Sequence, residues 1–177
     1  MPLWLIGMMG SGKSVVGRVL AARTDRGFFD TDQMVEARAG RSIGEIFADE
    51  GERGFRSRES DAIAAAAASG DAVIATGGGA VLLPANVAAM RASGPVVWLQ
   101  AGPSTLASRV GDGSSRPLLD GRSDDDGSEE IDLETRLSTM LQARLTAYEL
   151  AADFSVTTDQ ATVAEVAVLI EEIWNAS

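Results

Sequence analysis

The sequence predicts a three-layer α/β/α sandwich in which helices cover both faces of a central parallel five-stranded sheet. Its 177 residues are the length of a single domain, and 45% of them are hydrophobic, an ordinary fraction for a globular protein. Short apolar segments alternate with helical segments along the chain, which is typical of a parallel sheet with helical crossovers. We therefore expect one α/β domain, residues 1–177, with ligands at the carboxyl ends of the strands.

The predicted strands are short apolar segments, and the predicted helices carry capping signals and apolar stripes. The strands are expected at residues 3–6, 28–29, 72–75, 96–100 and 154–156. Ser42 followed by Glu45 fits a capping box, Gly70 suits a helix end and Pro84 a helix start. The helices are expected at residues 14–23, 42–47, 51–69, from 84, 103–110, 131–150 and 163–174.

Charge and composition exclude several classes of function. The net charge is −11, which argues against general nucleic-acid binding because that needs a basic face. With no cysteine and no histidine, the chain has no disulfide, thiol nucleophile, zinc-thiolate site or histidine acid–base catalyst. Its start lacks the basic region of a secretory signal, and no apolar run reaches about 18 residues. We expect a cytoplasmic protein without a membrane partner.

Residues 7–14 match the phosphate-binding loop pattern G-x-x-x-x-G-K-[ST]. A strand is predicted before them and a helix after them, as this loop requires. Its glycines let successive N–H groups point at phosphate oxygens, and the helix adds its positive N-terminal end. Lys13 would reach the β- and γ-phosphates of ATP, and the Ser14 hydroxyl would coordinate Mg²⁺.

Lys13 is the one lysine in the chain, beside 14 arginines. A lysine kept where arginine is otherwise used indicates a site that needs a compact point charge rather than a planar fork. The single lysine argues against a GTPase, whose N-K-x-D motif would need a second one, and against a protein kinase. The absence of histidine argues against gluconate-kinase-like sequences, whose acceptor segment normally carries one.

Two acidic residues follow the second predicted strand in Asp30-Thr31-Asp32. On an extended chain, residues at i and i+2 point the same way, so one carboxylate could hold water on a metal while the other meets the acceptor. The alternative is a turn followed by a helix N-cap, since aspartate suits both.

Three further features matter because an acidic protein needs local cations to bind anions. Arg56 and Glu59 are i,i+3 partners in a predicted helix, so Glu59 could aim the guanidinium, although a surface salt bridge is the commoner explanation of this spacing. Gly77-Gly78-Gly79 follows a buried strand and would let a ligand approach the backbone, unless it is a plain loop. Arg144 borders an apolar helix stripe, where it could bind a carboxylate bidentately.

Residues 112–134 form a strongly acidic segment. Nine acidic residues stand against Arg116 and Arg122, so the segment contributes −7 to the net charge. Its glycine, serine and aspartate content predicts a loop. A solvated loop is the simplest interpretation, but long loops in compact domains are often lids, and Arg116 favours a lid here.

Taken in order, five motifs resemble those of shikimate kinases. They are G-M-M-G-S-G-K-S, D-T-D, S-I-x-x-I-F-x-x-x-G-E-x-x-F-R-x-x-E, T-G-G-G and R-P-L-L, and the similarity extends over about residues 3–168. The resemblance implies a monomer with a P-loop NTPase fold of the nucleoside monophosphate kinase-like type. It implies Mg²⁺-dependent transfer of the γ-phosphoryl group of ATP to the 3-hydroxyl of shikimate, in aromatic amino-acid biosynthesis. It also implies a substrate-binding helical region at about 31–60 and a lid at about 111–130.

At the nucleotide end, the resemblance assigns several roles. Ser14 would bind Mg²⁺, and Asp30 would support the metal through water. Arg116 would swing in with the lid to meet the phosphates, while Arg109 and Gln160 would lie near adenine. The ATP phosphates would be held by Gly10, Ser11, Gly12, Lys13, Ser14 and Val15.

At the acceptor end, the resemblance makes Asp32 the group that binds the shikimate hydroxyls and orients or deprotonates the attacked one. Arg56 and Arg144 would clamp the shikimate carboxylate, with Arg56 braced by Glu59. The remaining contacts would come from the backbone N–H groups of Gly78 and Gly79 and from the rings of Phe47 and Phe55. The catalytic residues would be Lys13, Asp32 and Arg116.

Two points stay open. The 27 residues between Arg116 and Arg144 are more than the family leads us to expect, and the excess falls in the acidic run 120–130, which predicts altered lid kinetics. The acceptor could be a close analogue such as aminoshikimate, or the chain could be a relative that binds nucleotide without catalysis. Release of ADP with and without shikimate separates these alternatives.

Overall fold

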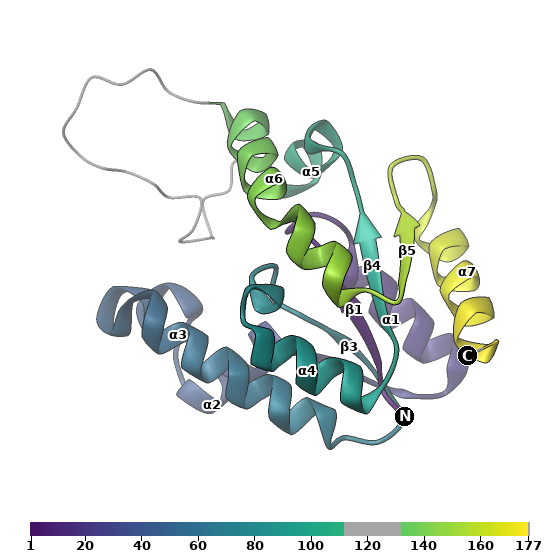
Figure 1. The fold of residues 1–177 in the computed structure, drawn as a ribbon, viewed down its shortest axis with the longest axis horizontal. Coiled ribbons are helices and arrows are strands. Elements are labelled where there is room, and N and C mark those ends of the chain that lie inside the picture. Colours follow the sequence, from purple (N-terminus) through teal and green to yellow (C-terminus); the bar gives the residue numbers. More distant parts are fainter. Residues whose placement is uncertain (112–131, 177) are drawn as a thin grey trace.

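The computed structural model describes residues 1–111 and 132–176 and shows helices on both faces of one parallel sheet (Figure 1). The strands are β1 (Leu3–Ile6), β2 (Gly27–Asp30), β3 (Ala72–Ala75), β4 (Val96–Gln100) and β5 (Phe154–Thr157). Within the described residues the sheet has five strands in the order β2-β3-β1-β4-β5, and every neighbouring pair is parallel. The predicted three-layer fold is therefore confirmed.

The helices begin and end close to the predicted positions. Two elements were not predicted individually, α2 and the short 3-10 turn η1, although α2 falls within the helical region expected at about 31–60. No helix in residues 1–111 and 132–176 has the length and apolarity needed to cross a membrane. The helices are α1 (Lys13–Thr24), α2 (Thr31–Ala39), α3 (Ile43–Ala67), η1 (Ala80–Leu82), α4 (Pro84–Ser93), α5 (Pro103–Val110), α6 (Leu133–Ala151) and α7 (Val163–Asn175).

Alternating side chains of the central strand β1 build two cores. Leu3 and Leu5 pack with α1 and α7 on one face of the sheet. Trp4 and Ile6 pack with α3, α4, α5 and α6 on the other face. All four side chains are fully buried, and a strand buried on both faces has a continuous apolar sequence, which made β1 recognisable.

Helices α2 and α3 have a small core of their own, formed by Val35, Ile46, Phe55 and Ala62. The capping box at the start of α3 is confirmed, since Ser42 and Glu45 each accept a hydrogen bond from the other's N–H group. Helix α3 breaks at Gly51, where φ is 67° and ψ is −176°. The two helices predicted at 42–47 and 51–69 therefore lie on either side of a kink in one continuous segment.

Gly17 in α1 provides a test of how β2 packs on that helix. A Cβ added to Gly17 would lie 2.5 Å from Cε2 of Phe28 and 3.2 Å from Cδ1 of Leu5. Gly17→Ala is expected to lower the free energy of unfolding by about 1–3 kcal/mol, although alanine favours helices more than glycine does. Urea denaturation measures the change, with Ser57→Ala on an exposed part of α3 as the control for helix propensity. A more stable Gly17→Ala variant would contradict this packing.

Candidate active site

A cavity of about 930 Å³ opens at the carboxyl ends of β1, β2 and β3. Its lining comes from the loop after β1, the start of α2, both sides of the α3 kink, the loop after β3, α5, α6 and the segment after β5. This edge is where parallel α/β sheets bind ligands. The volume is at the upper end of the range for small-molecule sites.

The loop between β1 and α1 has the geometry of a phosphate-binding loop. Gly7 has φ 144°, and a Cβ there would lie 2.5 Å from the carbonyl oxygen of Leu99, so this position needs glycine. The buried ammonium of Lys13 donates to the carbonyl oxygens of Gly7, at 2.9 Å, and Met8, at 2.8 Å. Because α1 begins at Lys13, the positive end of its dipole also lies at the loop. These features together favour a bound phosphate.

Ser14 and Asp30 form a pair of oxygen ligands beside this loop. The Ser14 hydroxyl donates to Oδ2 of Asp30 at 2.6 Å. The other oxygen, Oδ1, accepts a hydrogen bond from the N–H of Asp32 at 3.1 Å. A hydroxyl and a carboxylate this close fit Mg²⁺, which prefers oxygen ligands and usually keeps several of its waters.

The two aspartates of the D-T-D motif do not lie on an extended chain, so the prediction that they point the same way is wrong. Asp30 is the N-cap of α2, and Asp32 lies in the first helical turn. The N-cap alternative is thus confirmed for Asp30, yet both residues line the cavity. The turn at Thr31 separates the carboxylates, because Asp30 meets Ser14 whereas Asp32 meets the loop after β3.

Arg56 is held by two carboxylates of its own helix. Its Nη1 donates to Oε2 of Glu59 at 2.8 Å, and its Nη2 donates to Oε1 of Glu52 at 3.1 Å. Glu59 is only 1% exposed, so interpreting this spacing as a surface salt bridge is wrong. Burial raises the pKa of Glu59, the charge of Arg56 opposes that shift, and the charge of Asp32 adds to it. Burial also works against the charge of Arg56, but its ion pairs outweigh burial and leave its pKa raised.

The three glycines after β3 allow charged side chains to touch the backbone. A Cβ on Gly77 would lie 2.6 Å from both Oδ1 of Asp32 and Oε1 of Glu59. A Cβ on Gly79 would lie 2.5 Å from both terminal nitrogens of Arg56. A side chain at either position would therefore displace the acids or the guanidinium, so the triple glycine is more than a plain loop.

Arg144 and Tyr148, one turn apart on α6, meet the same loop from the other side. The Tyr148 hydroxyl donates to the carbonyl oxygen of Gly78 at 2.6 Å, and Nη1 of Arg144 donates to it at 3.4 Å. Tyr148 is fully buried and stacks on Trp98, with ring centroids 5.4 Å apart. The sequence predicted Tyr148 only as part of an apolar stripe. Its four-residue spacing from Arg144 was the available signal for a shared role.

Two phenylalanines from opposite sides of the α3 kink form an apolar wall of the cavity. The ring centroids of Phe47 and Phe55 are 4.8 Å apart, with an angle of 32° between the planes. The guanidinium of Arg56 lies 5.4 Å from the centroid of Phe55. A flat ring bearing a carboxylate would therefore find an apolar surface beside a cation.

The comparisons with known proteins agree with this geometry. A family model described as "Shikimate kinase" matches residues 9–174. The chain belongs to the shikimate kinase family. Shikimate kinases of Symbiobacterium thermophilum and Moorella thermoacetica are 47% and 46% identical to it, over 97% of this chain and 95% and 93% of theirs. The structure of shikimate kinase from Acinetobacter baumannii in complex with shikimate is similar, with a TM-score of 0.89, 31% identity, and coverage of 99% of this chain and 93% of that one.

Within this shikimate kinase fold, a P-loop NTPase fold, the far end of the cavity is formed by Arg109 and Thr158. Nη2 of Arg109 donates to the Thr158 carbonyl oxygen at 2.7 Å, and Nη1 donates to the Thr158 hydroxyl at 3.0 Å. Gln160, predicted near adenine, is exposed and stands outside the cavity lining formed by the described residues. Arg116 and the acidic run 120–130 lie outside the described residues.

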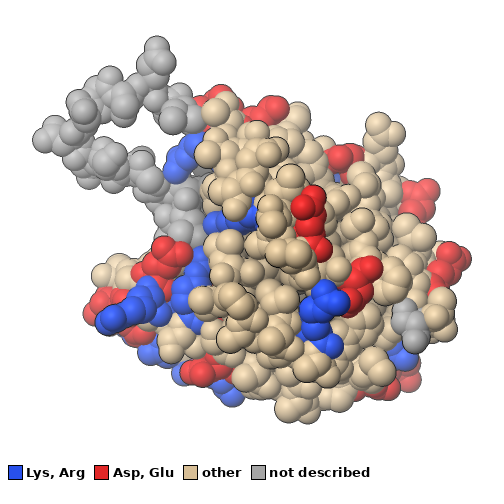
Figure 2. Space-filling model, viewed as in Figure 1, with Lys and Arg blue, Asp and Glu red and all other residues tan. Residues whose placement is uncertain are grey.

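Among the described residues, Arg23, Arg41, Arg56, Arg58 and Arg91 each pair with an acidic side chain. Figure 2 shows basic and acidic side chains side by side at the end of the molecule that carries α3. Arg56 there contacts Glu52 and Glu59, so its charge is fixed in place rather than spread over a surface patch. Cations are thus directed into the cavity even though the chain has a net charge of −11.

Tyr148 allows a direct test of this packing because it is the one tyrosine in the chain. Burial raises the pKa of Tyr148 to about 12, an effect that nearby Arg144 opposes and Glu59 reinforces. Since the pKa of Tyr148 in the folded protein lies above the ordinary tyrosine value of about 10, the stability that Tyr148 contributes is present below pH 10 and is lost between about pH 10 and 12. Ultraviolet absorbance of tyrosinate, recorded with circular dichroism, is expected to stay low near pH 10 while the protein is folded. Ionisation of Tyr148 near pH 10 in the folded protein would contradict its contact with Gly78. The Tyr148→Phe variant, which has no tyrosine, gives the background absorbance.

Proposed function

We propose that this cavity is the active site in which the chain uses ATP to phosphorylate the 3-hydroxyl of shikimate. The chain is an ATP-dependent kinase acting on shikimate, as its membership of the family implies. One observation supports this site: the phosphate-binding loop lines the same cavity as Asp32, Arg56 and Arg144. A carboxylate suits a hydroxyl and two guanidinium groups suit a carboxylate, so the cluster matches a small hydroxylated acid.

At the nucleotide end, the backbone N–H groups of the loop hold the phosphates, and Lys13 exchanges its carbonyl partners for phosphate oxygens. Ser14, and Asp30 through water, would hold Mg²⁺, which neutralises charge on the phosphates when bound. Arg109 and Gln160 border adenine in this proposal. The residues that bind ATP are Gly10, Ser11, Gly12, Lys13, Ser14, Val15, Arg109, Arg116 and Gln160.

At the acceptor end, Asp32 orients the 3-hydroxyl and accepts its proton while the new O–P bond forms and the bond to ADP breaks. Arg56, fixed by Glu59, and Arg144 bind the carboxylate of shikimate. Because both ligands are held in place, most of the rate enhancement comes from positioning and charge stabilisation. The backbone N–H groups of Gly78 and Gly79 and the rings of Phe47 and Phe55 complete the acceptor site.

Three parts of the proposal extend beyond the cavity. Arg116 supplies a cation to the transferred group from a lid at about 111–130, and it lies outside the described residues. The product enters aromatic amino-acid biosynthesis. We further propose that the protein is a cytoplasmic monomer whose partners are ATP and shikimate, with neither nucleic acid nor membrane among them.

A coupled assay of ADP release tests the function directly. We expect release that depends on both Mg²⁺ and shikimate, and a kcat lowered by about 10²- to 10⁴-fold in Asp32→Asn, which cannot accept the proton. Aminoshikimate is the comparison acceptor. Release without any acceptor, or with aminoshikimate alone, would refute shikimate as the substrate.

Substitution of Arg144 distinguishes shikimate binding from ATP binding. Arg144→Ala is expected to raise the KM for shikimate by about 10- to 100-fold, the loss associated with one charged hydrogen-bonded contact, and to change the KM for ATP far less. Arg136→Ala is the matched control, because Arg136 lies two turns earlier on α6 and is not among the described residues that line the cavity. Equal losses for both ligands would refute the role of Arg144 as a carboxylate clamp.

A further inference from the structure

The kink in α3 determines the shape of the acceptor end of the cavity. Residues 43–50 precede the kink and carry Phe47, whereas residues 52–67 follow it and carry Phe55 and Arg56. All three of these side chains line the cavity. The φ of 67° at Gly51 lies in the region that favours glycine, and nothing lies within 4 Å of a Cβ there, so conformation rather than space requires glycine. Gly51 itself therefore contributes no packing at the joint, and the apolar contact across it comes from Ile46, Phe47 and Phe55.

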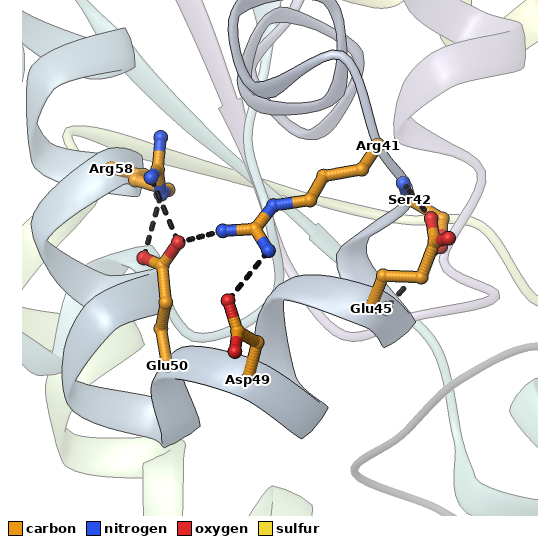
Figure 3. A network of polar contacts seen from close by, with 6 residues as sticks. All are labelled: Arg41, Ser42, Glu45, Asp49, Glu50 and Arg58. Atoms are coloured by element: carbon orange, nitrogen blue, oxygen red, sulfur yellow. Dashed lines mark hydrogen bonds and ion pairs between the residues drawn. The ribbon is translucent and has the colours of Figure 1, made fainter.

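A network of ion pairs spans this joint (Figure 3). Glu50, the last residue before the kink, accepts hydrogen bonds from Nε and Nη2 of Arg58, which follows the kink, each at 2.8 Å. Arg41, in the connection from α2, donates to the same carboxylate of Glu50. Arg41 also donates to Asp49 at 2.8 Å. Glu50 therefore ties the connection and both sides of the kink together.

Gly54 shows that the fold accommodates this position of Glu50. A Cβ on Gly54 would lie 2.3 Å from Cβ of Glu50 and 3.0 Å from its Oε2. Glycine inside a helix normally weakens it, so a helix with glycine here gives up local stability. What it gains is room for Glu50 to lie against the second side of the kink and reach Arg58.

The network consists of partly exposed side chains that do not line the cavity. The side chains of Glu50, Arg41 and Arg58 are 24%, 30% and 37% exposed. Single ion pairs at such exposure contribute little, but bidentate geometry and several coupled charges make a network effective. None of the three is among the described residues that line the cavity, so any effect on substrate passes through the position of α3.

We propose that Glu50 is a positioning residue that sets the angle of the α3 kink and thereby holds Phe47, Phe55 and Arg56 in register around the acceptor. This inference rests on the proposed function of the cavity, because it concerns the shikimate end of the site. It predicts that loss of the network weakens shikimate binding while leaving nucleotide binding and the phosphoryl transfer step almost intact. A merely structural role would lower stability without separating the two substrates.

The first test compares Glu50→Gln with Glu171→Gln. Glu171 pairs with Arg23 between α7 and α1 and is 27% exposed, so it matches Glu50 in exposure but lies away from α3. In Glu50→Gln the KM for shikimate is expected to rise about 3- to 10-fold, with kcat and the KM for ATP within about twofold of wild type. In Glu171→Gln all three parameters are expected to stay at wild-type values. Thermal unfolding of both variants gives the loss of stability against which these kinetics are compared.

The second test is Gly54→Ala, whose methyl group would lie 2.3 Å from Cβ of Glu50 and would therefore move the backbone at the kink without removing the charge of Glu50. Its KM for shikimate is expected to rise as in Glu50→Gln, because both changes alter the angle of the kink. An unchanged KM for shikimate in both single variants, or equal increases for shikimate and ATP, would overturn the proposal. Wild-type activity toward shikimate is measured first, so failure of the proposed function is seen before any variant is compared.

Discussion

The site depends on residues 77–79, three glycines without side chains. Because they are glycines, groups from three other parts of the chain can lie directly against their backbone. Asp32 and Glu59 reach it at Gly77, the phosphate-binding loop reaches it at Gly78, where a Cβ would lie 3.4 Å from the backbone nitrogen of Met9, and Arg56 reaches it at Gly79. Because β3 is the direct neighbour of β1, the sheet itself places this stretch beside the phosphate-binding loop. The two ends of the cavity are therefore joined by backbone packing and not by side chains alone.

This constraint explains how an acidic protein offers cations to anionic ligands. Arg56 is fixed by Glu59, a carboxylate that is almost fully buried, so its orientation is set before a ligand arrives. A guanidinium carries five N–H donors, and bonds to Glu59 and Glu52 leave others for a ligand. Lys13 is held by carbonyl oxygens, which phosphate oxygens can replace. The ion pairs thus orient the cationic side chains, while the N–H dipoles of the phosphate-binding loop attract the anionic phosphates.

The sequence predicted the parts of the fold and the site that depend on local pattern. Strand β1 is a buried apolar run and the loop after it carries its own signature, so both were recognisable without tertiary information. What failed depends on contacts between distant segments: α2 begins directly at Thr31, which turned the two aspartates apart, and Tyr148 contacts Gly78, 70 residues away. The same apolar periodicity describes a tyrosine that only fills a core and one that also holds a loop, so sequence spacing could not separate the two roles.

The acceptor end is built differently from the nucleotide end. The phosphate-binding loop is anchored between strands and helices of the two main cores. Helix α2 and the α3 residues around the kink share a small third core, and α3 joins a main core through Ile63 and Ala66 near its end. The arrangement of α2 and α3 therefore relies also on polar contacts where the two helices join and where α3 bends. These are the capping box at Ser42, the hydrogen bond from the N–H of Ile43 to the carboxylate of Glu36, and the ion pairs around Glu50. If Glu50 sets the angle of the kink as proposed, changes at these joints move the acceptor wall and leave the phosphate-binding loop in place. A fold divided in this way can vary its affinity for the acceptor without rebuilding the machinery of phosphoryl transfer.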